Sequence, residues 1–531
     1  MPSCQRRATP HPRGVAPKRA RSALKQTLSR LFKDAADAWQ RQDYAKTIDA
    51  LTRAARLDPG NAAIQLDLGR AHGLRYDYDA ARRCFDDAVR LAPHPASALS
   101  HAGQRCQEFG HYAMAREYFL RAATQQDVPP PALVTLAELS ERHARLDEAA
   151  EWVDRALARD AGCPPALLAR ARLSRLAGDL GAAESGVRSL LQRDFRDGWT
   201  RVRAWYELAA ILDRQERYDE AIAAAEQAKA PLRPASAGPA AVLHGIQARL
   251  REMAASLDPA RLQRWFESRD TLGPARPIAI LCGHPRSGTT LLEQMLDAHP
   301  GIVTAEETHV LHDEAYLPLS RGFALDTPVL DMLDAATPEA LRRSRHDYFR
   351  FTDACLGAEI GPRLLIDKNP ALSVLLPAVA RLFPEARFLV ALRDPRDVCL
   401  SCFLQPLALN PVSSAYLTLE STAAQYASVM AFWRALEPHL RNPCLSVRYE
   451  DVVADLPQAG RRVLDFLGLP WDETVTSFHR HARTRPLRSP SYSDVTRPIF
   501  TRAVGRWRHY EKHLAPISQT LAPFLTAFGY E

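Results

Sequence analysis

The stretch GHPRSGTT, residues 283–290, has the residue types and the spacing of a loop that binds an anion. Gly283 and Gly288 keep the G-x-x-x-x-G spacing of a phosphate-binding loop, in which glycines let backbone N–H groups approach a phosphate closely. Thr289, however, stands where a triphosphate-binding loop carries the lysine that reaches the β- and γ-phosphates. The loop therefore predicts a nucleotide with a short 5′ group and fits a triphosphate poorly.

Polar side chains add donors to this loop. The Arg286 guanidinium and the hydroxyls of Thr289 and Thr290 can each donate a hydrogen bond to an anion. An apolar run over residues 277–282 precedes the loop, and apolar residues on one helical face follow it. A strand, a tight turn and a helix N-terminus in this order are typical of anion sites in parallel α/β sheets.

Two motifs resemble those of a known family. PRSGTTLLEQMLDAHPGIVTAEET resembles the 5′-phosphosulfate loop of sulfotransferases that use 3′-phosphoadenosine 5′-phosphosulfate (PAPS), and most of all that of protein-tyrosine sulfotransferases. RDPRDVCLS follows the strand-like RFLVAL and supplies Arg393 with Ser401 eight residues on, as in the family's 3′-phosphate motif. The resemblance covers roughly residues 277–515 and implies PAPS as the co-substrate, with no metal.

The resemblance also implies roles for single residues. Lys368 in LLIDKNP matches the family's lysine at the 5′-phosphosulfate, so the cation that the loop lacks would come from another strand. Tyr449 in VRYEDV matches a tyrosine that contacts the cofactor, and Arg506 in VGRWRHYEKHL matches a late basic residue near the 3′-phosphate. Glu307, the second carboxylate of EET, matches the general base, whereas Glu306 would be a structural carboxylate.

These matches imply a site for in-line sulfuryl transfer. Glu307 would take the acceptor proton, while Lys368 and Arg286 would stabilise the charge that develops on the leaving group. Taken singly, each residue also fits an ordinary surface or strand position. The residues implied to bind the donor are Arg286, Ser287, Gly288, Thr289, Thr290, Lys368, Arg393, Ser401, Tyr449 and Arg506.

Two other functions stay open. A phosphoryl-transfer enzyme with a degenerate P-loop would need an acid after a strand to hold Mg²⁺, and Asp367 is the candidate. A repeat scaffold with an inactive sulfotransferase domain would lack donor contacts. The acceptor hydroxyl also stays open between a protein tyrosine, a glycan, a lipid and a small molecule, since His309 stands where the tyrosine-protein enzymes carry a substrate-side arginine.

The first half of the chain repeats with a period of about 34 residues, which is typical of tetratricopeptide repeats. A further unit follows at Tyr218 and Ala221 after a short insertion. We expect about six helix pairs, whose concave face would bind a protein or peptide or hold a neighbouring domain. A column of small residues shows the period: Thr47, Ala81, Ala115, Ala149 and Ala183.

Four segments are expected. They are a disordered basic arm over residues 1–27, an all-α tetratricopeptide-repeat solenoid over 28–235, a helical linker over 236–275 and a sulfotransferase domain over 276–531. In the last segment apolar strands alternate with helices, which indicates a parallel, doubly wound α/β sheet. The resemblance implies the three-layer, P-loop-like form of that fold. Strands are predicted at 277–282, 363–367, 387–392 and 444–449.

Composition narrows the partners and the compartment. The net charge of +7 is concentrated in the first 30 residues, so we expect a solvated tail and no nucleic-acid partner. The nine cysteines are scattered and odd in number, which is typical of reduced thiols. Without an apolar run of about 18 residues we expect no membrane span and a cytoplasmic protein. An arginine-rich start without acids is also typical of a transit peptide.

Overall fold

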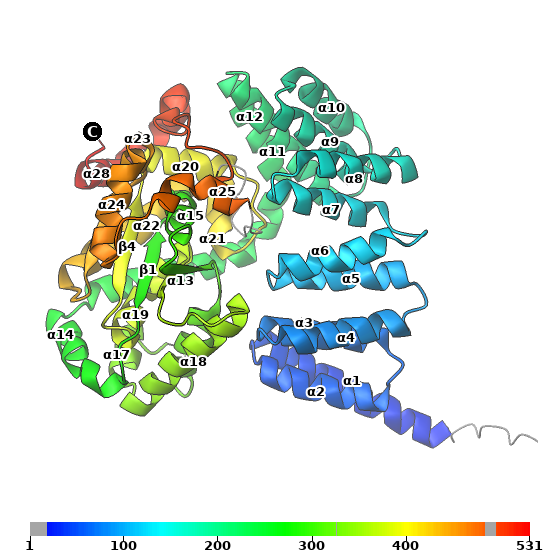
Figure 1. Ribbon diagram of the computed structural model, residues 1–531, viewed down its shortest axis with the longest axis horizontal. Coiled ribbons are helices and arrows are strands. Elements are labelled where there is room, and N and C mark those ends of the chain that lie inside the picture. The colour runs from blue at the N-terminus through cyan, green and yellow to red at the C-terminus, as the bar shows by residue number, and fades with distance from the viewer. Residues whose placement is uncertain (1–17, 325, 484–494, 531) are drawn as a thin grey trace, which may run out of the picture. The chain divides into compact units, whose positions relative to one another are not determined.

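The computed structural model describes residues 18–324, 326–483 and 495–530 (Figure 1). The basic arm expected over residues 1–27 lies outside this description up to residue 17, and helix α1 (Lys18–Gln40) begins within the segment expected as an arm. The chain forms two compact units, one ending at Gln125 and the other beginning at Gln126.

The first unit consists of helix pairs, α1 with α2, α3 with α4 and α5 with α6. Asp43, Asp77 and His111 recur at the repeat period, and each side chain accepts a backbone N–H in the first turn of the second helix of its pair. The predicted helical repeats are thus confirmed. The helices after α1 are α2 (Tyr44–Leu57), α3 (Ala62–Leu74), α4 (Tyr78–Leu91), α5 (Pro95–Glu108) and α6 (Tyr112–Ala123).

The second unit begins with further helix pairs of the same kind. The predicted column of small residues is buried in both units, because each member of the column from Thr47 to Ala221 is at most 1% exposed. The repeat helices of this unit are α7 (Pro130–Arg142), α8 (Leu146–Arg159), α9 (Pro164–Ala177), α10 (Leu180–Gln192), α11 (Gly198–Arg214) and α12 (Tyr218–Lys229). After the 3₁₀ helix η1 (Ala230–Ser236), helices α13 (Ala237–Ala255) and α14 (Pro259–Glu267) lead to the sheet.

The sheet of the second unit is parallel, with strand order β2-β3-β1-β4-β5. The four predicted strands are present within one residue of their expected ends, and β2 is an addition that the sequence analysis missed. The strands are β1 (Ile278–Gly283), β2 (Ile302–Glu306), β3 (Leu364–Lys368), β4 (Arg387–Leu392) and β5 (Cys444–Arg448).

Helices cover both faces of this sheet, as expected for a three-layer α/β domain (Figure 1). Because side chains alternate along a strand, Ala279 and Leu281 pack in one core with α15 (Thr289–Asp297) and α24 (Leu456–Leu467). The intervening residues of β1 are equally buried. The other helices that matter for the site are α18 (Pro338–Leu356), α19 (Leu376–Leu382), α20 (Pro395–Leu404), α22 (Leu419–Leu436), α23 (Tyr449–Ala454) and the 3₁₀ helix η8 (Arg506–Tyr510).

The last repeat pair packs on the α/β domain through a buried lysine. Lys229, at the end of α12, donates from Nζ to the Tyr416 carbonyl at 2.7 Å and to the Tyr206 hydroxyl at 3.0 Å. Its ammonium lies 4.2 Å from the ring centroid of Phe403 on α20. Burial lowers the pKa of Lys229 to about 7. The repeats from α7 onward and the α/β domain therefore share one compact unit. No helix in the described residues is long and apolar enough to cross a bilayer.

Two left-handed glycines of this unit allow a matched stability test. Gly288 has φ +94°, and a Cβ there would lie 2.7 Å from Cδ2 of Tyr449, whereas Gly178 has φ +92° with nothing within 4 Å. We expect Gly178→Ala to cost only the left-handed strain of about 1–2 kcal/mol. Gly288→Ala should cost about 1–3 kcal/mol more, because the ring must move. Denaturant unfolding of ligand-free protein measures both, and equal losses would contradict the crowding by Tyr449.

Candidate functional site

The loop between β1 and α15 has the geometry of an anion cradle. A Cβ on Gly283 would lie 2.5 Å from the Ala391 carbonyl oxygen of β4, so only glycine lets the two strands pair closely here. Arg286 has a positive φ of 72°, and the Ser287 N–H donates to the His284 carbonyl at 3.1 Å. The first N–H groups of α15 have no acceptor within the helix and are suited to an external anion.

A buried lysine stands beside this loop at the end of β3. Lys368 has no exposed surface, and its Nζ lies 2.9 Å from Glu307 Oε1, 3.0 Å from Glu293 Oε2 and 3.6 Å from Glu306 Oε1. The parallel register sets this arrangement, because Lys368 pairs with Leu281 of β1 on one side and with Glu306 of β2 on the other. The structure thus places the predicted lysine and the predicted base, Glu307, in contact.

The Lys368 ammonium group pairs with the carboxylates of Glu293, Glu306 and Glu307, and these four residues form the Lys368 cluster. Burial alone would lower the pKa of Lys368, but the three carboxylates outweigh burial and hold the pKa above its ordinary value. Glu293, on α15, is fully buried, and this burial raises its pKa well above the usual range in spite of Lys368. The sequence analysis missed Glu293; its only signal is an acid within a helix whose neighbours are buried.

The two candidate bases differ in accessibility. The Glu307 side chain is 31% exposed and that of Glu306 is 13% exposed. Glu307 has a positive φ of 47°, and its N–H donates to the Lys368 carbonyl at 2.7 Å, which fixes the turn after β2. Glu307 is therefore the carboxylate of this pair that a second substrate reaches more easily.

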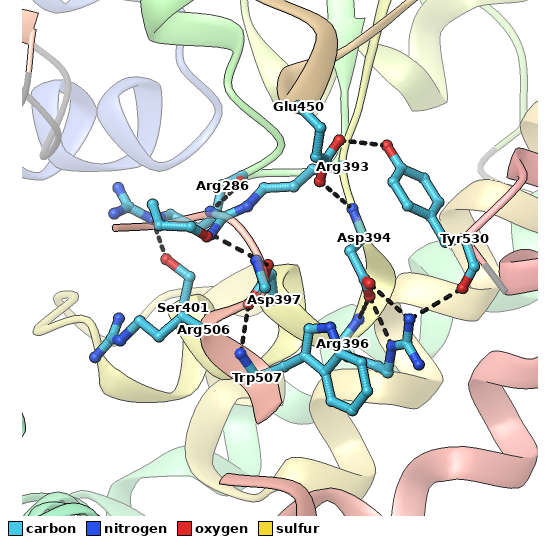
Figure 2. A network of polar contacts seen from close by, with 12 residues as sticks. Arg286, Arg393, Asp394, Arg396, Asp397, Ser401, Glu450, Arg506, Trp507 and Tyr530 are labelled. Atoms are coloured by element: carbon cyan, nitrogen blue, oxygen red, sulfur yellow. Dashed lines mark hydrogen bonds and ion pairs between the residues drawn. The ribbon is translucent and has the colours of Figure 1, made fainter. Parts of the chain in front are cut away.

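The predicted 3′-phosphate motif follows β4, which flanks β1 on the side away from β3, and Figure 2 shows its residues. Arg393 donates from Nη1 to the Arg286 carbonyl at 3.2 Å, and its guanidinium lies 4.9 Å from the ring centroid of Tyr449. Its buried Nε has no partner among the described residues. Arg286 donates from Nε to the Ser401 hydroxyl at 3.0 Å. Four of the predicted donor-binding residues are thus neighbours.

Arg506 reaches this region from the C-terminal segment. Asp397 of α20 holds its backbone, accepting the N–H groups of Gly505 and Trp507 at 2.8 Å each (Figure 2). The Arg506 side chain pairs with Asp213 of repeat helix α11, Nη2 to Oδ1, at 2.8 Å. The sequence analysis found neither aspartate, because their partners lie far away along the chain.

Arg286, Ser401 and Arg506 line one cavity of about 580 Å³. Its opposite wall comes from the repeat helices α7, α9 and α11, with Arg142, Arg172 and Arg203 among the lining residues. Neither Lys368 nor Glu307 lines it. The described residues contain no cluster of three His, Cys, Asp or Glu side chains suited to a metal ion.

Comparisons with known proteins identify the family. The sequence model of the sulfotransferase family matches residues 277–473, and that of the tetratricopeptide repeat matches residues 202–230. Protein-tyrosine sulfotransferase 1 of Mus musculus is 30% identical over 273 residues, which are 48% of this chain and 70% of that protein. The chain belongs to the sulfotransferase family.

Two further relatives match over shorter shares of their own length. The protein-tyrosine sulfotransferase of Drosophila melanogaster is 26% identical over 48% of this chain and 52% of that protein, and an uncharacterized protein of Aquifex aeolicus is 27% identical over 46% of this chain and 32% of its own. The chain thus spans about half or less of these two relatives. The sulfotransferase domain of the Synechococcus PCC 7002 olefin synthase is 25% identical, with a TM-score of 0.30, over 44% of this chain and 88% of that one.

From the Lys368 cluster we predict that Lys368→Ala causes a large loss of stability. This change leaves Glu293 buried without its cation, and breaking a buried pair in this way typically costs about 3–5 kcal/mol. Burial then raises the pKa of Glu293 further above 4.5, so that the folded state binds a proton that the unfolded state lacks. The stabilisation by this bound proton is lost as the pH rises through the pKa that Glu293 has in the folded variant. The loss of unfolding free energy relative to the unaltered protein should therefore be smaller at about pH 5 than at about pH 8.

Two controls accompany this measurement by denaturant unfolding. Glu293→Gln added to Lys368→Ala removes the stranded charge and should recover much of the stability. Lys512→Ala, which breaks an exposed pair with Asp219, should cost far less. A loss in Lys368→Ala no larger than that in Lys512→Ala, or one that does not depend on pH, would contradict this description of the cluster.

Proposed function

We propose that this sulfotransferase moves the sulfuryl group of PAPS to an acceptor hydroxyl. The observation that carries the proposal is the meeting of two motifs at one sheet edge: the glycine loop after β1 and Arg393 after β4. Lys368 is the last residue of β3, which lies between β1 and β2. The 30% identity to a mouse protein-tyrosine sulfotransferase supports the same conclusion. The two phosphate ends of PAPS match the two halves of this anion site.

The residues present fit this donor. The main-chain N–H group of Gly288 and the hydroxyls of Ser287, Thr289 and Thr290 would hold the 5′-phosphosulfate. The 3′-phosphate would contact Arg393, whose buried Nε has no partner among the described residues, together with the Ser401 hydroxyl.

Tyr449 and Arg506 complete the proposed donor contacts. Tyr449 packs against the loop at Gly288 and beneath the Arg393 guanidinium, and Arg506 shares a cavity with Arg286 and Ser401. When bound, PAPS supplies an activated sulfuryl group with a good leaving group. The protein has only to hold the donor, orient the acceptor and accept a proton.

In the proposed mechanism Glu307 accepts the proton of the acceptor hydroxyl as the oxygen forms its bond to sulfur. The bond from sulfur to the phosphate oxygen breaks in line, and its electron pair leaves on adenosine 3′,5′-bisphosphate. Lys368 and Arg286 stabilise this charge.

The phosphoryl-transfer alternative is less well supported by the position of Asp367. This residue is on β3 next to Lys368, and successive side chains of a strand point to opposite faces. Asp367 accepts a hydrogen bond from the Tyr348 hydroxyl of α18 at 2.8 Å, and burial raises its pKa to about 7. A buried carboxylate paired in this way is poorly placed to hold Mg²⁺ beside the loop.

The class of acceptor, the cellular compartment and the domain boundaries are further parts of this proposal. The protein-tyrosine sulfotransferases among the relatives favour a tyrosyl peptide, and a repeat face suits a protein partner. The eight described cysteines are free thiols, which suits the cytoplasm. We propose the repeats over residues 28–235, the linker over 236–275 and the transferase domain over 276–531.

Glu307→Gln should lower turnover by about 10²–10⁴ while PAPS affinity stays the same, because a positioned base contributes in this range. Transfer of radiolabelled sulfate from PAPS to tyrosyl peptides, glycans and a cell extract gives the rate and identifies the acceptor class. Glu306→Gln is the matched control, since Glu306 lies farther from Lys368 and is less exposed. A large loss in Glu306→Gln with normal turnover in Glu307→Gln would reverse the roles of the two carboxylates.

Arg393→Ala should lower the ratio of the affinity for adenosine 3′,5′-bisphosphate to the affinity for AMP, because Arg393 is proposed to bind the 3′-phosphate. Calorimetry with both nucleotides measures the ratio. Arg396→Ala removes a nearby guanidinium that is already paired with Asp394, at 2.7 Å, and should leave the ratio unchanged. Equal affinity of the unaltered protein for ATP, with a requirement for Mg²⁺, would instead favour the phosphoryl-transfer alternative.

A further inference from the structure

Asp213 connects a repeat helix to a proposed donor-binding arginine. It lies in the last turn of α11, and its Oδ1 accepts hydrogen bonds from Arg506 Nε at 3.1 Å and from the Tyr510 hydroxyl at 2.6 Å. Arg506 Nη2 lies 2.8 Å from the same oxygen. The Asp213 side chain is 12% exposed, so these contacts are largely shielded from water and from salt.

Arg506 is held from two sides, and each side comes from a different part of the fold. Asp397 of the α/β domain fixes the backbone on both sides of Arg506 through the N–H groups of Gly505 and Trp507. Asp213 of the repeats fixes the side chain. A guanidinium is a planar fork with five donors, so a carboxylate on its Nε–Nη2 edge also sets the direction of the Nη1 donors.

The cavity beside Arg506 is suited to the nucleotide end of the donor. It is lined by Ser401 and Arg506, both proposed to lie at the 3′-phosphate, but by neither Glu307 nor Lys368, which the proposed mechanism places at the sulfuryl group and the acceptor. The repeat helices α7, α9 and α11 form its other wall. A ligand bound here through its phosphate would therefore contact the transferase domain and have the repeats on its other side.

We infer that repeat helix α11 is part of the donor site, with Asp213 as the positioning residue that directs the Arg506 guanidinium to the 3′-phosphate of the nucleotide. This inference rests on the proposed function. It assigns the repeats from α7 onward a role in binding the donor, apart from any partner that they hold.

A second contact between the same segments provides the matched control. Asp219 of α12 pairs with His513 and Lys512, just beyond Arg506, and Tyr218 stacks on His509 with ring centroids 4.7 Å apart. The Asp219 side chain is 62% exposed and does not contact Arg506. These interactions dock the C-terminal segment on the repeats, whereas Asp213 is hydrogen bonded to the Arg506 side chain itself.

The test measures affinities of the full chain for adenosine 3′,5′-bisphosphate and for AMP by calorimetry. Asp213→Asn should weaken bisphosphate binding about tenfold and leave AMP binding unchanged, whereas Asp219→Asn should change neither. Asp213→Glu should recover part of the loss. In an Arg506→Ala background Asp213→Asn should have no further effect, because it acts through that arginine.

Each other outcome overturns the inference. An equal loss for both nucleotides, or the same loss in Asp219→Asn, would show that Asp213 only docks the segment. Tighter bisphosphate binding in Asp213→Asn would show that the aspartate competes with the phosphate for Arg506. If that variant fails to fold, Tyr510→Phe removes one hydrogen bond to Asp213, and an unchanged nucleotide ratio there would be equally negative. An unaltered protein without preference for the bisphosphate would instead overturn the proposed function itself.

Discussion

The parallel pairing of β1 with both β3 and β4 is the constraint on which the site depends. Gly283 lies opposite Ala391 and Leu281 lies opposite Lys368, so the ends of three strands reach the same sheet edge in register. β1 leads into the loop, β3 ends at Lys368, and Arg393 follows β4. A slip of one residue in either pairing would turn Lys368 or the loop to the other face of the sheet.

The chemistry at this edge depends on charges that are buried and shared. A single ammonium group among three carboxylates is expensive to desolvate, and it is kept in place by β2, β3 and α15 together. The same principle recurs on the other side of the loop, where Arg393 and Arg506 are held by carbonyls and aspartates from distant segments. Burying these charges lowers the stability of the fold, and it fixes cations near the places where a bound anion would lie.

Local patterns predicted most of the fold, and contacts that are distant in sequence account for what was missed. The strand at 387–392 was predicted to the residue, because an apolar run and turn signals mark both of its ends. β2 was missed because the sequence IVTAE is short and half polar. Motif spacing predicted Arg286 and Ser401, which are hydrogen bonded. Spacing carries no information on the Asp213–Arg506 pair, whose members are 293 residues apart.

The repeats that follow Gln125 share one compact unit with the transferase domain. The contacts of Lys229, Asp213 and Asp219 with the transferase domain all belong to the second unit. Because these contacts fix the positions of α11 and α12, an insertion in this part of the repeats is expected to be tolerated only where both helices keep their register. Within the second unit, α11 and α12 are thus expected to vary as little in evolution as the transferase residues that they contact.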